Sequence, residues 1–297
     1  MSKASPTSDR AAAVAQFLPQ TAFEILDGAR TALRNDELGD TVAIHETRKA
    51  IKRWRALLRL MTFALGDESK RLRREARDLA HALGRSRDAQ SALDALDDVL
   101  AHCPPGALPE SAPGAMRERL LARRTKAEAA HLDADERERL ATVLDANAEA
   151  IETWPLTHAR FCDLTDALCK TYRRGRRRVP DDWQTADPDQ FHELRQRTVE
   201  LRYQLECVAP LLPGMPPRMI SDAQRLRGQL GRRQDLTLLW PLMAPRQPLA
   251  RWQTRLVPLI EARQAHHVAT AERIAARVFA DPPKTFRKQL VGFRKAL

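Results

Sequence analysis

The chain of 297 residues has few aromatic residues, few glycines and no long apolar stretch. Aromatic residues make up 5% of the total and glycine occurs 11 times, whereas the helix formers Ala, Leu, Arg, Glu and Gln are abundant. Segments in which Val, Ile or Tyr alternate with polar residues are scarce, so we expect few strands. No stretch approaches 18 apolar residues, so we expect no membrane-spanning helix. This composition predicts an all-α protein.

Closely spaced cysteine pairs and an apolar stretch near the start of the sequence are also missing. Four cysteines, Cys103, Cys162, Cys169 and Cys207, are scattered without a CxxC pair. Their spacing suggests no zinc site and fits a reducing compartment. The first 20 residues contain no apolar signal core. We therefore expect cytoplasmic residence, no membrane partner, no cofactor and no metal.

Acidic residues are absent from one part of this basic chain. The formal net charge is +11 and the pI about 10.1, which predicts an anionic partner such as nucleic acid, a membrane surface or a polyphosphate. Residues 47–65 contain no acidic residue, and residues 45–59 read HETRKAIKRWRALLR. Solvated helix faces normally mix charge signs, because like charges four residues apart repel. An anion bound to this stretch would offset the repulsion.

A helical phase of about 100° per residue divides this stretch into two faces. The apolar face carries Ile44, Ile51, Trp54, Leu57, Leu58 and Met61. The opposite face carries His45, Arg48, Lys49, Lys52, Arg55 and Arg59, whereas Arg53 lies off this stripe. An ordinary amphipathic helix with a solvated polar face is the simpler interpretation of one such helix. The following segment repeats the pattern with Lys70, Arg73 and Arg77 on one face.

The sequence contains an internal repeat at an offset of 147 residues. His45, Arg48 and Arg55 correspond to His192, Arg195 and Arg202, within HELRQRTVELRYQLE at residues 192–206. The same offset aligns HALGRSRD (81–88) with GQLGRRQD (228–235). Two motifs at one unbroken offset indicate a duplicated helical unit. The second copy is weaker, because Gln196 and Val199 stand where the first has Lys49 and Lys52.

Proline- and glycine-rich stretches at 102–114, 177–189 and 211–218 indicate loops between helices. We expect one domain over residues 11–297, with an N-terminal helical half (11–180) and a C-terminal helical half (187–297). The expected helices lie near 10–34, 41–65, 68–100, 115–131, 134–151, 157–178, 189–210, 217–243, 249–279 and 282–295.

Five motifs, HETRKAIKRWRALLR, LGRSRD, YRRGRRR (172–178), HELRQRTVELRYQLE and LGRRQD, occur in an order that resembles the CHAD family, the conserved-histidine α-helical domain. The resemblance covers nearly the whole chain after the first ten residues. It implies two four-helix-bundle-like halves related by a pseudo-two-fold axis, whose basic faces line a shared cavity or groove. It also implies binding of inorganic polyphosphate and targeting to polyphosphate granules.

Carried over by position, the family motif falls on His45, Arg48, Lys52, Arg53, Arg55, His192, Arg195, Arg202 and Tyr203. Gln196, Val199 and Glu200 depart from the basic residues that the family favours there. The full predicted site is His45, Arg48, Lys49, Lys52, Arg53, Arg55, Arg59, Lys70, Arg73, Arg77, Tyr172, Arg173, Arg176, His192, Arg195, Arg202, Tyr203 and Arg227. Arginine matches phosphate oxygens with a planar fork of donors and lysine supplies a point charge. Protonated histidine adds a further charge, so binding should tighten as the pH falls through neutral.

Three alternatives stay open. Nucleic acid shares the electrostatics of polyphosphate, but the chain has few aromatic residues for stacking and no helix-turn-helix or zinc-finger spacing. An enzyme is less favoured, because His45-Glu46 opens HExxK rather than the zinc signature HExxH. The neighbouring pair His266-His267 is expected at the surface, and Asp88 and Asp235 are expected to orient arginines. The third alternative is an interaction module for an acidic protein.

We predict a non-catalytic protein whose partner is inorganic polyphosphate or another polyanion; the sequence defines no oligomeric state.

Overall fold

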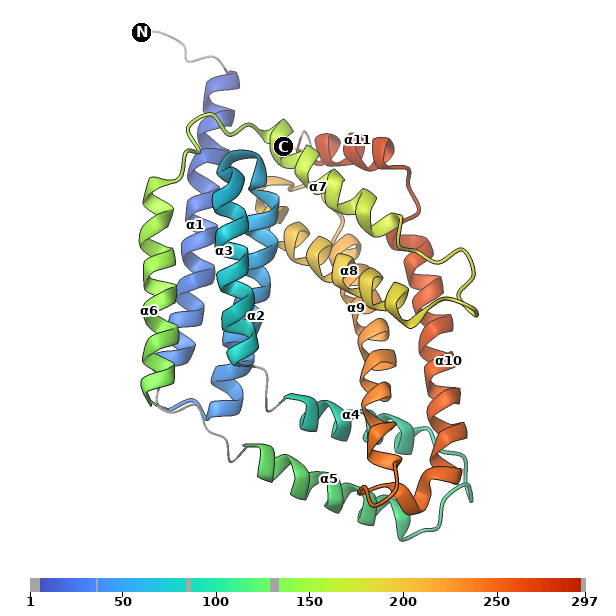
Figure 1. Cartoon of the computed structure of the whole chain (residues 1–297). Helices are drawn as coiled ribbons and strands as arrows, with labels where there is room; N and C mark the ends of the chain where they lie inside the picture. Colours follow the sequence, from blue (N-terminus) through green and yellow to red (C-terminus); the bar gives the residue numbers. More distant parts are fainter. Residues whose placement is uncertain (1–5, 36, 84–86, 129–133, 295–297) are drawn as a thin grey trace, which may run out of the picture.

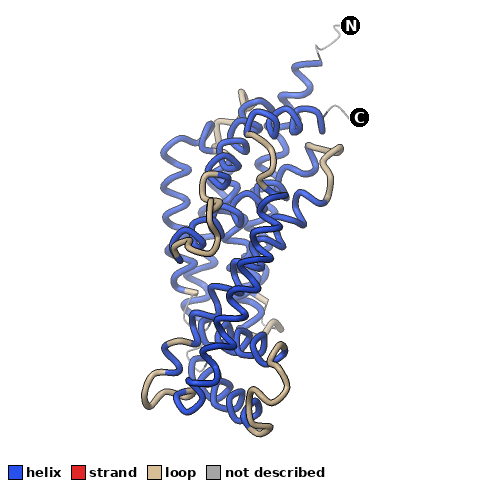
Figure 2. The backbone as a smooth tube through the Cα atoms, turned by 90° about the vertical axis from the view of Figure 1, so that its right-hand side faces the viewer, coloured by secondary structure: helices blue, strands red, loops and turns tan. Residues whose placement is uncertain are grey.

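The computed structural model describes residues 6–35, 37–83, 87–128 and 134–294, and over these residues it contains helices and no strand (Figures 1 and 2). The all-α prediction is confirmed. None of the helices in these ranges combines the length and the apolar character that crossing a bilayer requires. The α-helices are α1 (Pro6–Arg34), α2 (Asp40–Leu60), α3 (Thr62–Ala82), α4 (Arg87–Ala101), α5 (Ala112–Glu128), α6 (Ala134–Ala150), α7 (Phe161–Arg176), α8 (Pro188–Val208), α9 (Arg218–Leu236), α10 (Gln253–Val278) and α11 (Pro283–Arg294).

Two of the expected helices are interrupted. The segment 68–100, expected as one helix, is divided between α3 and α4; Gly84, Arg85 and Ser86 of LGRSRD lie outside the described residues. The segment 217–243 is helical only to Leu236. It continues in two short 3₁₀ helices, η3 (Thr237–Leu239) and η4 (Pro241–Met243), because Pro241 has no backbone N–H for an α-helical hydrogen bond. Further 3₁₀ helices are η1 (Ile151–Thr153), η2 (Ala209–Leu211) and η5 (Ala250–Trp252).

A tight turn folds α3 back on α2 (Figure 1). Gly66 has a φ of 54°, a left-handed conformation that favours glycine. The buried Ser69 hydroxyl donates to the carbonyl oxygen of Leu58 at 2.7 Å and so ties the start of α3 to the end of α2. The basic faces of the two helices are thereby brought side by side.

The apolar face predicted for α2 lies in the main hydrophobic core. Ile51, Trp54, Leu57, Leu58 and Met61 are each at most 2% exposed. Trp54 stacks on Trp154 after α6, with ring centroids 5.7 Å apart. Since the apolar face of α2 is buried, its basic face points to the other side of the helix.

The helices pack in two groups around this core. Helices α1, α2, α3 and α6 form an upright bundle (Figure 1). On the other side, α8 packs against α7 and α9, α11 packs against α7, and α10 packs against α9. The groups meet where α2 contacts α8. There the fully buried Gln204 side chain donates from Nε2 to the carbonyl oxygen of Ala56 at 3.0 Å.

The predicted division at residues 180–187 does not coincide with this packing. Helices α4 and α5 belong to the N-terminal half in sequence, yet they lie near the lower ends of α9 and α10 (Figure 1). They share a second hydrophobic core with the C-terminal half, in which Leu96 and Met116 join Leu236 and Leu256.

A buried polar cluster fastens α4 to α9 and α10. Asp98 accepts two hydrogen bonds from Arg263, at 3.1 and 2.8 Å, and lies 2.9 Å from Nε2 of His267. The Nδ1 atom of His267 is 2.7 Å from Oε1 of Gln229. The prediction of a surface position is wrong for His267, which is 1% exposed. The hydrogen-bond partners on both ring nitrogens explain how this polar side chain is accommodated in the interior.

Candidate anion-binding site

The basic faces of α2 and α3 meet α8 and α9 at a cavity of about 300 Å³, which we call cavity A. Its lining is rich in cations and combines both copies of the repeat. The residues are Lys52, Arg55, Ala56 and Arg59 of α2, Arg73 of α3, Arg195, Gln196, Val199 and Glu200 of α8, and Arg227 of α9. The repeat therefore places side chains from positions about 150 residues apart around one space.

A second cavity of about 430 Å³, cavity B, adjoins the first, since Lys52 and Arg227 line both. Its basic wall comes from the first turns of α2 and from α8. The other lining residues are Ile44, His45, Arg48, Lys49, Gln90, Ser91, Asp94, Arg202, Tyr203, Gln224 and Asp235. Asp235 of LGRRQD lines cavity B together with Arg48, Arg202 and Arg227. The exposed Asp88 lines neither cavity.

Cations are crowded in cavity A. Burial lowers the pKa of Arg55, and the neighbouring Arg59 and Arg77 lower it further. Burial also lowers the pKa of Arg59 and of Arg73, and like charges nearby add to the effect in both cases. These arginines remain charged at neutral pH, but their depressed pKa values show that the site disfavours their charge. A bound anion would offset the repulsion between these positive charges.

One carboxylate, that of Glu200, lies among the arginines of cavity A. Oε1 of Glu200 is 2.7 Å from Nε of Arg59, and Oε2 is 3.1 Å from Nη1 of Arg197. The Glu200 side chain is 10% exposed. Glu200 was predicted to weaken the second copy of the repeat; the structure shows that it pairs with an arginine of the first copy.

Two arginines that neighbour cavity A without lining it were missed in the sequence. Arg197 bonds Glu200, and Arg174 of α7 lowers the pKa values of Arg59 and Arg73 by its charge. Arg174 belongs to YRRGRRR, so the motif pointed to the right segment but not to the right residue. Arg197 gave no sequence signal, because its equivalent in the first copy is Ala50.

Arginines of cavity B are held by their surroundings. Arg48 donates from Nη1 to the carbonyl oxygens of Ala80 and Leu83, at 3.1 and 2.7 Å, at the C-terminal end of α3. Arg202 lies over the Tyr203 ring at 4.4 Å and donates to Glu206 at 2.6 Å. Lys49 pairs with Glu46 at 3.0 Å but is about half exposed, so its ammonium is accessible.

Seven predicted site residues line neither cavity. Arg53 lies beside the buried Cys207 and Lys70 pairs with the exposed Asp67. Arg77 stands close enough to Arg55 to lower its pKa. His192 lies one helical turn before the lining residue Gln196, and the Nε2 atoms of the two side chains are 2.6 Å apart. The remaining three belong to α7 and are Tyr172, Arg173 and Arg176.

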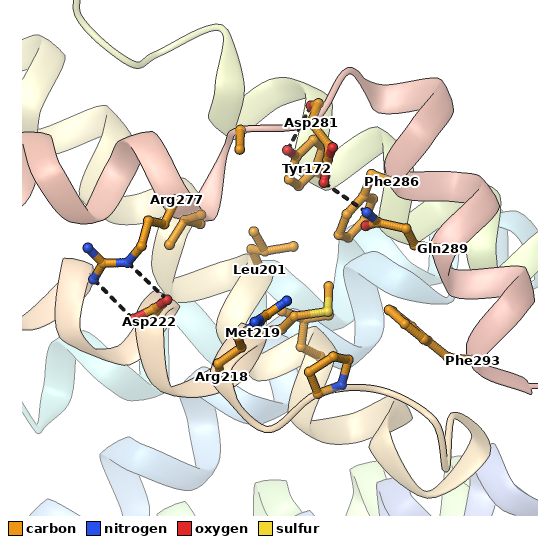
Figure 3. Close-up of a pocket in the computed structure, with 14 residues that line it drawn as sticks. Tyr172, Leu201, Arg218, Met219, Asp222, Arg277, Asp281, Phe286, Gln289 and Phe293 are labelled. Carbon is orange, nitrogen blue, oxygen red and sulfur yellow. Dashed lines mark hydrogen bonds and ion pairs between the residues drawn. The ribbon is translucent and has the colours of Figure 1, made fainter. Parts of the chain in front are cut away.

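Tyr172 is a core residue, contrary to its predicted place in the site. It is 1% exposed, stacks on Phe286 and donates its hydroxyl to the carbonyl oxygen of Asp281 at 2.8 Å. Burial raises the pKa of Tyr172 to about 12. It lines a separate, largely apolar cavity of about 490 Å³, where Figure 3 shows it beside Asp281 and Phe286. Of the two arginines, Arg176 donates to the carbonyl oxygen of Phe279 and Arg173 is exposed.

The cavities offer donors for oxyanions rather than ligands for a cation. Within residues 6–35, 37–83, 87–128 and 134–294, no three His, Cys, Asp or Glu side chains gather as metal ligands would. All four cysteines are free thiols.

Fold and site together define an all-helical protein with an interior lined by arginine and lysine. The family model described as the CHAD domain matches residues 22–244, and the chain belongs to this family. The family is associated with polyphosphate binding. A solved structure, the crystal structure of the CHAD domain from the plant Ricinus communis, is similar in fold with a TM-score of 0.55 and 22% sequence identity. The match covers 95% of this chain and 92% of the plant chain. A search of curated proteins gives no significant match.

Proposed function

We propose that this protein binds inorganic polyphosphate in cavities A and B without hydrolysing it. The observation that carries the proposal is the crowding of Arg55, Arg59 and Arg73, whose pKa values are all lowered. Adjacent like charges in a half-buried cavity are unfavourable unless an anion fills it. A polyphosphate chain carries about one negative charge per phosphate and many oxygens, which suits a row of forked donors.

The arrangement of Lys52 and Arg227 supports a chain-like ligand. Each of them lines both cavities, so a linear polyanion can contact cavity A and cavity B through a shared pair of cations. Two separate phosphate ions would not need such a junction.

The described lining of cavities A and B has no accessible aromatic face, which favours polyphosphate over single-stranded nucleic acid as their ligand. Tyr203 is the one aromatic side chain among the described residues that line the cavities, and it is 3% exposed beneath Arg202. Proteins that bind single strands usually stack bases on open aromatic faces.

The packing of equivalent helices in the two halves also supports the proposal. At an offset of 147 residues, α1, α2, α3 and α6 correspond to α7, α8, α9 and α11. In both sets the first helix packs on the second and the fourth, and the second packs on the third. We therefore propose that the two sets repeat one bundle and that α2 and α8 meet near the axis, which presents both basic faces to one ligand.

A competition assay tests the proposal. Long-chain polyphosphate should bind the purified protein, and binding should weaken steeply with salt, because a log–log slope of about −0.7 per phosphate contact is typical of single-stranded polyanions. At one salt concentration and equal phosphate concentration, duplex DNA should fail to displace it. Displacement by DNA at equal phosphate would contradict the proposal and favour a nucleic-acid-binding protein.

Two further assays test the role. Incubation with polyphosphate, with and without Mg²⁺, should release no phosphate above the blank; release that depends on the protein would make it a phosphatase. We further propose that binding targets the protein to polyphosphate granules in the cytoplasm. A fluorescent fusion should then co-localise with the granules, and charge reversal at Lys52 should disperse it.

A further inference from the structure

Glu200 lines cavity A, and its carboxylate lies against two arginines. Its two carboxylate oxygens lie 2.7 and 3.1 Å from guanidinium nitrogens of Arg59 and Arg197. Its side chain is 10% exposed, so water screens these interactions little. A carboxylate and a phosphate residue of a chain each offer one negative charge and two terminal oxygens to an arginine.

Glu200 also acts on the arginines that it does not touch. Its charge raises the pKa of Arg55, Arg59 and Arg73, against burial and against the like charges that lower it. Glu200 is therefore a counter-charge for the whole group. It allows the cations to be gathered in the folded protein before any ligand arrives.

The 147-residue offset shows a charge-swapped pair across the two copies. Arg59 corresponds to Glu206, and Glu200 corresponds to Arg53. The charges of Arg53 and Glu206 both act on the Cys207 thiol, and Glu206 accepts a hydrogen bond from Arg202 at 2.6 Å. The first copy thus has arginines at both positions, Arg53 and Arg59, where the second copy has Glu200 and Glu206.

We infer that Glu200 is a tethered competitor of the ligand, which occupies Arg59 and Arg197 in the free protein and limits the affinity of cavity A for polyphosphate. This inference rests on the proposed function. A bound phosphate chain must displace the carboxylate or share the two guanidinium groups with it. Repulsion between the two anions makes binding weaker and more readily reversible than the number of cations alone implies.

Glu200→Gln tests this inference, because it keeps the size of the side chain and removes the charge. The variant should bind long-chain polyphosphate about tenfold more tightly at moderate salt. Its salt dependence should steepen by up to about 1.4 in log–log slope, since two released arginines can each contact a phosphate. Glu193→Gln is the matched control: Glu193 lies on the same helix and pairs with Arg178 at 2.6 Å, but it is about half exposed and lines neither cavity.

Thermal melting gives a second readout. Without polyphosphate, Glu200→Gln should melt at a lower temperature than the wild type, because the arginines lose their counter-charge. With polyphosphate, its melting temperature should rise by more than that of the wild type. If Glu200→Gln does not fold, Glu200→Asp replaces it; the shorter, still charged side chain should give a smaller gain in affinity.

The outcomes separate this inference from the proposed function. If the wild type does not bind polyphosphate, the proposed function is wrong. If the wild type binds and Glu200→Gln binds equally or more weakly, Glu200 is a structural partner that positions the arginines, and the competitor role is wrong. Tighter binding by Glu200→Gln but not by Glu193→Gln supports the inference.

Discussion

Arg48 donates from Nη1 to the carbonyl oxygen of Leu83 at 2.7 Å, so a residue predicted to bind phosphate also closes the end of α3. The last carbonyl groups of a helix have no partner within the helix, and a cation there also complements the helix dipole. Arg195, the equivalent residue of the second copy, lies against Gly231, where an added Cβ would be 3.4 Å from its Nε. Arg48 thus contacts Leu83, and Arg195 lies beside Gly231, which follows Leu230, the equivalent of Leu83.

Arg48→Met should consequently lower the free energy of unfolding by about 1–3 kcal/mol, because the carbonyl groups of Ala80 and Leu83 lose a charged donor. It should also weaken polyphosphate binding. Lys49→Met is the control for stability, since Lys49 is about half exposed and its ion pair with Glu46 lies at the surface. Urea denaturation of both variants checks the prediction; equal stability would show that the Arg48 bonds contribute little.

Lys52 should be the most sensitive lysine for binding. It lines both cavities, so its removal affects contacts on either side of the junction. Lys52→Met should weaken polyphosphate binding by about five- to tenfold and reduce the log–log salt slope by about 0.7. Lys70→Met changes the net charge equally, but Lys70 is exposed, pairs with Asp67 and lines neither cavity. Similar losses in the two variants would indicate a diffuse electrostatic effect rather than a site.

Substitution of Gln196 or Val199 should weaken polyphosphate binding less than substitution of Arg48 or Lys52.

Local sequence patterns were sufficient for most of the helices and for the face of α2 that lines cavity A. The apolar positions Trp54, Leu57 and Leu58 are buried as their spacing predicts, which leaves Lys52, Arg55 and Arg59 at cavity A. Helical period is a property of the nearest few residues, so one sequence suffices to predict it.

Contacts between segments far apart in the sequence could not be predicted from these local patterns. The side chain that balances Arg59 is Glu200, 141 positions away, and nothing near either residue indicates the pair. The packing of α4 and α5 under α9 and α10 was missed for the same reason, since an apolar face does not specify its partner. YRRGRRR looked like one basic patch, but Tyr172 and Gly175 face the core, where a Cβ on Gly175 would come within 2.8 Å of the Phe279 ring.

The corrected position of Tyr172 gives a test of the site boundary. Tyr172→Phe removes the hydrogen bond to the carbonyl oxygen of Asp281 and keeps the ring stack on Phe286. It should lower the free energy of unfolding by about 1 kcal/mol and leave polyphosphate affinity unchanged. Isothermal titration and denaturation measure the two quantities. A clear loss of affinity at unchanged stability would place Tyr172 in the binding site after all.

Polyphosphate binding should tighten as the pH falls from about 8 to 6, because protonation of a neutral histidine adds a positive charge beside the ligand. His45 is exposed and lines cavity B, whereas His192 lines neither cavity. His45→Gln should therefore flatten the pH dependence more than His192→Gln. Affinities measured at constant ionic strength check this. A wild-type affinity that does not change over this range would contradict the role of histidine.

Asp98 should make the stability of the protein sensitive to acid. Burial alone would raise its pKa, but the hydrogen bonds and charges of His267 and Arg263 hold the pKa well below its ordinary value. A depressed pKa in the folded state stabilises the protein above the unfolded pKa of about 3.9, and this stabilisation is lost as the pH falls below it. Asp98→Asn should thus lower the free energy of unfolding by about 3 kcal/mol at pH 7, since it leaves Arg263 without its carboxylate. The difference from the wild type should shrink between about pH 4 and pH 2.

Asp97→Asn is the neighbouring control, because the pair of Asp97 with Arg117 is about half exposed and should contribute little. Denaturation curves over this pH range measure both variants, and a difference that stays constant on acidification would rule out the buried carboxylate as its source.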